Sequence, residues 1–191
     1  MFAQIFIAAL RILSFRAGPQ DLPFDPRQTW PLMLAAAGAN VAVFVQVLPL
    51  SSAVAMAAAM VAGTALVTRS VLRARGVPER FSQTFHALLA TATVLTLLML
   101  PLFAQVAPML RQIAEHPELL EQPDTLKLPQ SVVLLMNLLN FWNFAVTAHI
   151  FRHAANVPFW VGVIVALIIA FVVLFVVAFA GTLAGTLFGM G

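Results

Sequence analysis

The sequence predicts an all-α polytopic membrane protein, a helical bundle of five transmembrane helices preceded by a short amphipathic helix at the membrane surface. The chain of 191 residues is 62% hydrophobic and 9% charged, and its mean hydropathy is +0.98. A soluble domain carries about 25% charged residues, so this chain has too few polar groups to cover a water-soluble surface. The charged residues also gather in short segments that separate long apolar runs.

Residues 1–17 predict an amphipathic interfacial helix rather than a cleaved signal peptide. No basic residue precedes the apolar run, Arg11 interrupts it, and the segment is too short to span a bilayer. On a helix, Gln4, Arg11 and Ser14 fall on one side. The apolar side comprises Phe2, Ile5, Phe6, Ala9, Ile12 and Leu13. A frayed apolar tail is the alternative.

A turn-rich, proline-rich linker follows and completes a cytoplasmic region, residues 1–30, ahead of the transmembrane domain, residues 31–191. Asp21 and Asp25 are expected to accept hydrogen bonds from nearby backbone N–H groups and so to cap short turns. The alternative is a docking motif for a cytoplasmic protein partner. That motif would comprise Gly18, Pro19, Asp21, Leu22, Pro23 and Asp25.

Charge-free runs predict the five spans, because roughly 20 apolar residues cross about 30 Å of hydrocarbon. The first long run is broken at residues 49–52 by a proline and two serines, which predict a turn. The second span is expected to be the shortest. The spans are expected near residues 31–48, 53–69, 84–106, 131–151 and 158–181.

The distribution of basic residues predicts a cytoplasmic N-terminus and an extracytoplasmic C-terminus. With five spans, only Arg111 and Lys127 fall on the outer side. The inner side holds Arg11, Arg16, Arg27, Arg69, Arg73, Arg75, Arg80 and Arg152. Arg69, Arg73, Arg75, Arg80 and Arg152 are expected to set the topology and to contact lipid headgroups.

The fourth predicted span carries the most polar stripe, formed by Asn137, Asn140, Asn143 and Thr147, with Trp142 on the other side. Amides at membrane depth are expected to face the bundle interior. They either bond to neighbouring helices, or line a polar cavity that holds a headgroup or a solute. Partners on other spans are expected among Asn40, Gln46, Thr91 and Thr93.

The histidines and the outer acidic loop predict neither a metal site nor a catalytic site. His149 and His153 have the spacing of a metal-binding pair, but no carboxylate lies near them in the sequence. His86 is expected to be an interfacial residue. The acidic loop lacks HExxH, calcium-loop and nucleophile motifs, and predicts a solvated surface helix. Its ionisable residues are Glu115, His116, Glu118, Glu121 and Asp124.

Several features narrow the function. No ionisable residue of the Asp, Glu, Lys or Arg type lies well inside a predicted span, which disfavours ion-coupled pumps. The sequence has no basic face with interleaved aromatic residues, so it does not predict nucleic-acid binding. Small residues at four-residue spacing predict close helix packing within the chain or in a homo-oligomer. They are Ala55, Ala59 and Gly63 in the second span, and Gly162, Ala166 and Ala170 in the fifth.

The chain resembles the Yip1-like (Yip1 domain) membrane proteins in its Asp-Leu-Pro linker, Gly18–Pro26, its five closely spaced spans and its fourth span, Asn140–His153. That span has an early tryptophan and a basic cytoplasmic end. The resemblance implies a bacterial inner-membrane relative without the long polar N-terminal extension of eukaryotic members.

The expected function is that of a non-enzymatic scaffold or organiser without cofactor or metal, with membrane lipids and a cytoplasmic protein as partners. The alternative is a protein that binds or transports a lipid or a small solute through the asparagine stripe. A membrane enzyme that uses the acidic outer loop is a third, weaker hypothesis.

Overall fold

The computed structural model describes residues 2–23, 25–116, 118–119 and 129–187, and within these ranges the chain forms helices and no strand. α1 (Phe2–Leu13) is followed by two short 3-10 helices, η1 (Pro19–Asp21) and η2 (Pro26–Gln28). The longer helices are α2 (Thr29–Phe44), α3 (Leu50–Ala74), α4 (Phe81–Glu115), α5 (Gln130–Ala154) and α6 (Phe159–Leu187), with η3 (Pro78–Arg80) before α4.

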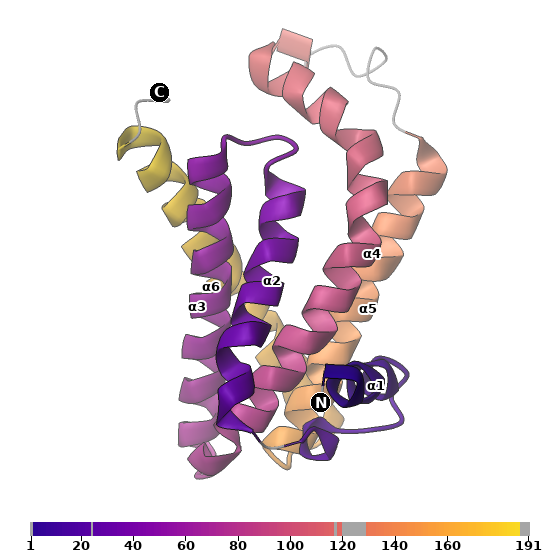
Figure 1. Ribbon diagram of the computed structural model, residues 1–191, viewed down its shortest axis with the longest axis vertical. Coiled ribbons are helices and arrows are strands. Elements are labelled where there is room, and N and C mark those ends of the chain that lie inside the picture. The colour runs from indigo at the N-terminus through magenta and orange to yellow at the C-terminus, as the bar shows by residue number, and fades with distance from the viewer. Residues whose placement is uncertain (1, 24, 117, 120–128, 188–191) are drawn as a thin grey trace.

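Figure 1 shows a bundle in which α2 to α6 run along the long axis while α1 lies across one end. The α3–α4 and α5–α6 connections lie at this same end, which is here called the α1 end. The pairs α2/α3 and α4/α5 splay apart toward the other end, and α6 packs against both α3 and α5. α4 bends in its upper part, where Pro101 and Pro108 each remove a backbone donor from the helical hydrogen-bond ladder.

The predicted helical bundle is confirmed, and among the described residues four helices are long and apolar enough to cross a membrane: α3, α4, α5 and α6. These are the long apolar helices of an integral membrane protein. α2 has 16 residues and is therefore about 24 Å long, less than the roughly 30 Å of a hydrocarbon core. The expectation that the second span is the shortest is wrong, because α3 has 25 residues.

α3, α4, α5 and α6 continue past the ends of their predicted spans, because a helix continues through charged residues until its backbone is capped, whereas α2 ends before residue 48. α3 ends where Gly76 adopts φ 70°, and Val77 N donates to Leu72 O at 2.9 Å. α5 ends in the same way at Asn156, φ 49°. Glycine and asparagine are the residues that adopt this left-handed cap conformation most readily.

The core of the bundle lies toward the α1 end. It gathers residues of α4 between Thr84 and Leu95, the last turns of α5, and the inner faces of α1, α2 and α6. Phe151 and Ile150 are completely buried there.

Candidate functional site: a cavity between the helices

α5 presents its polar stripe to a cavity in the middle of the bundle. The cavity has a volume of about 410 Å³ and is bounded by residues of five helices. Its polar side chains are Asn140, Asn143 and Thr147 from α5, and Thr64 from α3. The remaining lining is apolar and comprises Phe44, Met60, Leu88, Ala92, Phe144, Ala166, Ile169, Ala170, Val173, Leu174 and Val177.

Three of the four predicted stripe residues are thus brought together at this cavity, whereas Asn137 lies outside its lining; Asn137, Asn140 and Asn143 are all exposed on the surface of the protein. The side-chain amides of Asn140 and Asn143 form no hydrogen bond with any group in the described ranges. Thr147 Oγ1 donates to Asn143 O at 2.8 Å, and Thr64 Oγ1 donates to Met60 O at 2.8 Å. Both hydroxyls therefore satisfy their donor within their own helix.

The expected partners on other helices do not reach the stripe. Asn40 Nδ2 donates to Ala36 O at 2.8 Å, and Gln46 Nε2 donates to Ala42 O at 3.1 Å. Thr91 and Thr93 likewise donate to carbonyl oxygens four residues earlier in α4. Back-bonding within a helix is the usual solution for isolated polar side chains in apolar surroundings. It leaves the amides of Asn140 and Asn143 as the uncommitted polar groups of the cavity.

Trp142 faces away from the cavity, as the helical periodicity predicts. Its Nε1 donates to Leu13 O at 3.0 Å, and His149 Nε2 bonds to Ala17 O at 3.0 Å. Between these two bonds lies the ring of Phe15, whose φ of 58° is unusual for a residue with a side chain. The opposite face of α5 from the asparagines is therefore the face on which α1 is held.

The linker motif is built around its two carboxylates. Gly18 N donates to Asp21 Oδ2 at 2.7 Å, and Arg27 N donates to Asp25 Oδ1 at 2.9 Å. Leu22 is 3% exposed, and Pro19 is also buried. These contacts match the capping interpretation of Asp21 and Asp25. Pro23 is half-buried within the same linker.

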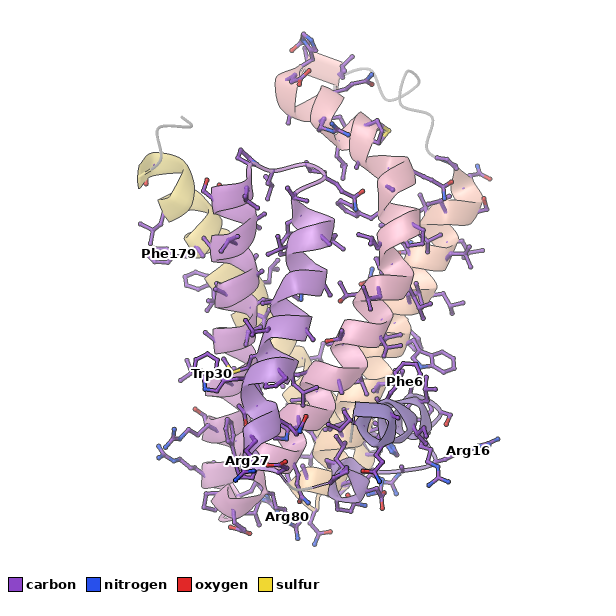
Figure 2. The ribbon with its side chains drawn as sticks, in the orientation of Figure 1. Phe6, Arg16, Arg27, Trp30, Arg80 and Phe179 are labelled. Atoms are coloured by element: carbon purple, nitrogen blue, oxygen red, sulfur yellow. The ribbon has the colours of Figure 1, made fainter. Side chains whose placement is uncertain are left out.

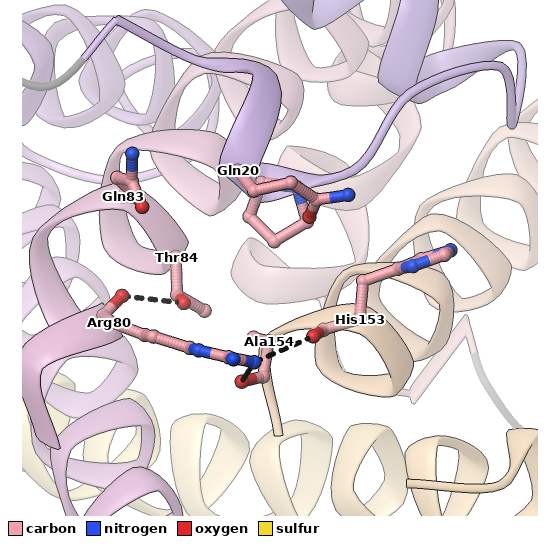
Figure 3. Close-up of a pocket in the computed structure, with 7 residues that line it drawn as sticks. Gln20, Arg80, Gln83, Thr84, His153 and Ala154 are labelled. Carbon is pink, nitrogen blue, oxygen red and sulfur yellow. Dashed lines mark hydrogen bonds between the residues drawn. The ribbon is translucent and has the colours of Figure 1, made fainter. Parts of the chain in front are cut away.

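The five arginines expected to contact headgroups, Arg69, Arg73, Arg75, Arg80 and Arg152, are all exposed. Arg80 has a further role that sequence reasoning missed. Its Nη1 donates to Ala154 O at 3.0 Å and to His153 O at 3.4 Å, and so caps the end of α5. Figure 3 shows this contact at the edge of a pocket of about 210 Å³. Gln20, Gln83 and Thr84 also line that pocket.

The expectation that His86 is interfacial is wrong. His86 is 1% exposed, and its Nε2 lies 2.8 Å from Thr29 Oγ1 at the start of α2. Buried polar groups require such a partner. The partner is 57 residues away in the sequence, so no local pattern signals this pair.

The acidic loop is described only in part. His116 Nδ1 lies 3.0 Å from Glu118 Oε1, and both side chains are exposed. Glu121 and Asp124 lie outside the described residues. Within the described ranges, no three ligand-type side chains are grouped so as to hold a metal ion.

Comparison with protein-family models, with curated proteins and with solved structures finds no match to this chain. Membership of the Yip1-like family therefore stays a prediction.

Proposed function

We propose that the protein binds an uncharged amphiphilic molecule in the interhelical cavity, with the polar group of that molecule at Asn140 and Asn143. The observation that carries this proposal is that the side-chain amides of Asn140 and Asn143 face an open cavity and have no hydrogen-bond partner among the described residues. An amide in apolar surroundings costs free energy unless it is hydrogen-bonded. A bound molecule with a carbonyl or hydroxyl group would supply that partner.

The lining of the cavity argues for an uncharged ligand. None of the residues around it carries a charge. An ion taken out of water into such a site without a counter-charge is strongly disfavoured. The apolar side chains of α6, including Ile169, Val173 and Leu174, provide a surface for a hydrocarbon chain. The combination fits a lipid-like molecule with a neutral polar group.

The proposed topology is five spans with a cytoplasmic N-terminus, in a bacterial inner membrane. In support of a fifth span, the turn after α2 continues the hydrogen-bonded ladder, and Leu48 N donates to Phe44 O at 2.8 Å. The helix ends that carry Arg69, Arg73, Arg75, Arg80 and Arg152 all lie at the α1 end. α2 and α6 also begin at the α1 end. Trp30 and Trp160, each the second residue of its helix, are exposed, and exposed tryptophans mark a membrane interface.

The scaffold hypothesis and a docking role of the linker receive less support. Leu22 is buried against the bundle, and both linker carboxylates are bonded to the backbone. A docking protein would have to displace these contacts. The non-enzymatic, cofactor-free character of the protein remains part of the proposal.

Native mass spectrometry of the purified protein tests ligand binding. We expect the wild type to retain a defined small molecule, and the double variant Asn140→Leu/Asn143→Leu to retain roughly tenfold less. Each hydrogen bond in a membrane interior contributes about 0.6 to 1.7 kcal/mol, and 1.4 kcal/mol is a tenfold change in affinity.

The matched control is Asn137→Leu, because Asn137 lies on the same helix but does not line the cavity. This variant should retain the molecule as the wild type does. Equal losses in the control and in the double variant, or no retained molecule in the wild type, would contradict the proposal.

A further inference from the structure

α1 has an outward face that combines apolar and cationic side chains. Ile7 and Leu10 are 54% and 44% exposed. Together with Arg11, Ser14 and Arg16 they line a shallow groove along this face. The opposite face of α1 is buried in the bundle core through Ile5, Ala8, Ala9, Ile12 and Leu13. Phe6, expected on the same apolar side of the helix as Ile5 and Ile12, is 54% exposed.

The two arginine side chains of this groove are not needed as hydrogen-bond donors to the last carbonyl groups of α1. The last carbonyl groups of α1 already have donors. Ser14 N bonds to Leu10 O at 3.0 Å, Phe15 N to Ile12 O at 2.9 Å, and Arg16 N to Arg11 O at 2.9 Å. Trp142 supplies the donor for Leu13 O. A basic side chain near a helix end often serves these carbonyls, but here the backbone and the indole serve them.

The two guanidinium groups also have no carboxylate partner among the described residues, where the one ion pair joins His116 and Glu118. Figure 2 shows the Arg16 side chain pointing away from the bundle. Two uncompensated cations, Arg11 in the last turn of α1 and Arg16 in the turn that follows it, form a site for an anion. Since they lie beside exposed Ile7 and Leu10, the anion they suit is attached to hydrocarbon.

The position of α1 agrees with such a ligand. In Figure 2, Phe6 on α1 lies at about the same level along the bundle as Trp30 at the start of α2. Trp30 is 70% exposed, and exposed tryptophans gather at the level of lipid headgroups. The groove on α1 is therefore at the depth of lipid phosphates.

We propose that this groove binds an anionic phospholipid, with its phosphate between Arg11 and Arg16 and its acyl chains against Ile7 and Leu10. The site is separate from the interhelical cavity, which is uncharged and on the opposite face of α5 from α1. α1 would then be an interfacial helix that selects anionic lipid rather than one that merely rests on the bilayer.

The test is native mass spectrometry of the detergent-purified full chain, titrated with phosphatidylglycerol or with zwitterionic phosphatidylcholine. The wild type should retain phosphatidylglycerol in preference to phosphatidylcholine. The Arg11→Gln/Arg16→Gln variant should bind phosphatidylglycerol on the order of tenfold or more weakly, because each basic residue near a lipid surface contributes to anionic-lipid binding. The Arg11→Lys/Arg16→Lys variant should keep the preference in weakened form, since it retains the charges.

Arg27→Gln/Arg111→Gln is the matched control, because both residues are exposed, lie on other elements and are not among the arginines expected to contact headgroups. It should behave as the wild type. Equal weakening in this control would mean a non-specific charge effect and would overturn the proposal. So would unchanged binding in Arg11→Gln/Arg16→Gln, or a dimer that this variant dissociates, which would assign the groove to a second copy of the chain.

Discussion

The indole Nε1 of Trp142 donates a hydrogen bond to the main-chain oxygen of Leu13, 3.0 Å away, and so joins the end of α1 to the middle of α5. Asn143, the next residue after Trp142, lies on the other side of α5 and lines the interhelical cavity. One helix thus holds α1 on one face and the proposed ligand site on the other. This arrangement makes the attachment of α1 and the lining of the cavity separable by single substitutions.

The first prediction concerns the attachment of α1. Trp142→Phe keeps an aromatic ring but removes the donor to Leu13 O. α1 should therefore detach from α5 and unfold locally more often. We expect backbone hydrogen exchange in α1 to rise roughly fivefold, which corresponds to about 1 kcal/mol. Trp160→Phe is the control, because that indole is 76% exposed on α6. Equal exchange in the wild type and Trp142→Phe would show that the ring contacts alone hold α1.

The second prediction separates two glycines in the small-residue motifs. A Cβ at Gly162 would lie 2.5 Å from Ala148 O of α5, whereas a Cβ at Gly63 would lie 3.6 Å from Val173 Cγ2 of α6. Gly162→Ala should therefore force α5 and α6 apart and destabilise the protein by about 1 to 3 kcal/mol. Gly63→Ala should be tolerated. Thermal unfolding in detergent measures both, and similar melting temperatures for the two variants would contradict the packing described.

The third prediction isolates the backbone at Gly76. A Cβ at Gly76 or at Gly38 would meet nothing within 4 Å, but Gly76 has φ 70° while Gly38 lies inside α2. Gly76→Ala should cost about 1 kcal/mol of left-handed strain. Gly38→Ala should stabilise by up to about 1 kcal/mol, because alanine favours a helix over glycine. Effects of the same sign in unfolding experiments would refute the assignment of Gly76 as the α3 cap.

The fourth prediction tests the cap that Arg80 places on α5. Arg80→Ala removes the donor to Ala154 O and His153 O, and should destabilise the end of α5 by about 1 kcal/mol. Arg75→Ala is the control, since Arg75 is also exposed at the α1 end. Faster hydrogen exchange confined to the last turn of α5 in Arg80→Ala is the expected result. An identical change in both variants would count against the cap.

The helices could be predicted from the sequence because apolar runs without charge have few other solutions in a membrane. Their ends could be predicted less well, since charge-free runs stop at arginines while the backbone continues to a cap such as Gly76 or Asn156. The length of α3 was underestimated for this reason. α2 is shorter than its predicted span because it ends in turns held by backbone hydrogen bonds. Such bonds do not depend on the side chains, so the sequence does not indicate where α2 ends.

The candidate site was predicted in part. Helical periodicity places Asn140, Asn143 and Thr147 on one face and Trp142 on another, and the structure agrees. The periodicity could not show that a cavity lies next to that face, because the cavity depends on how five helices pack together. Contacts such as that of His86 with Thr29, or the left-handed Phe15 held by α5, join residues far apart in the sequence.

The most direct measurement of the central claim is photo-crosslinking from within the cavity. A photo-reactive amino acid replaces Phe144, which lines the cavity, or Leu135, which is exposed on α5 outside it. After irradiation in membranes, the adducts are identified by mass spectrometry. We predict that position 144 captures one defined uncharged amphiphile and that position 135 captures the bulk lipid mixture. The same mixture of adducts at both positions would contradict a specific ligand in the cavity.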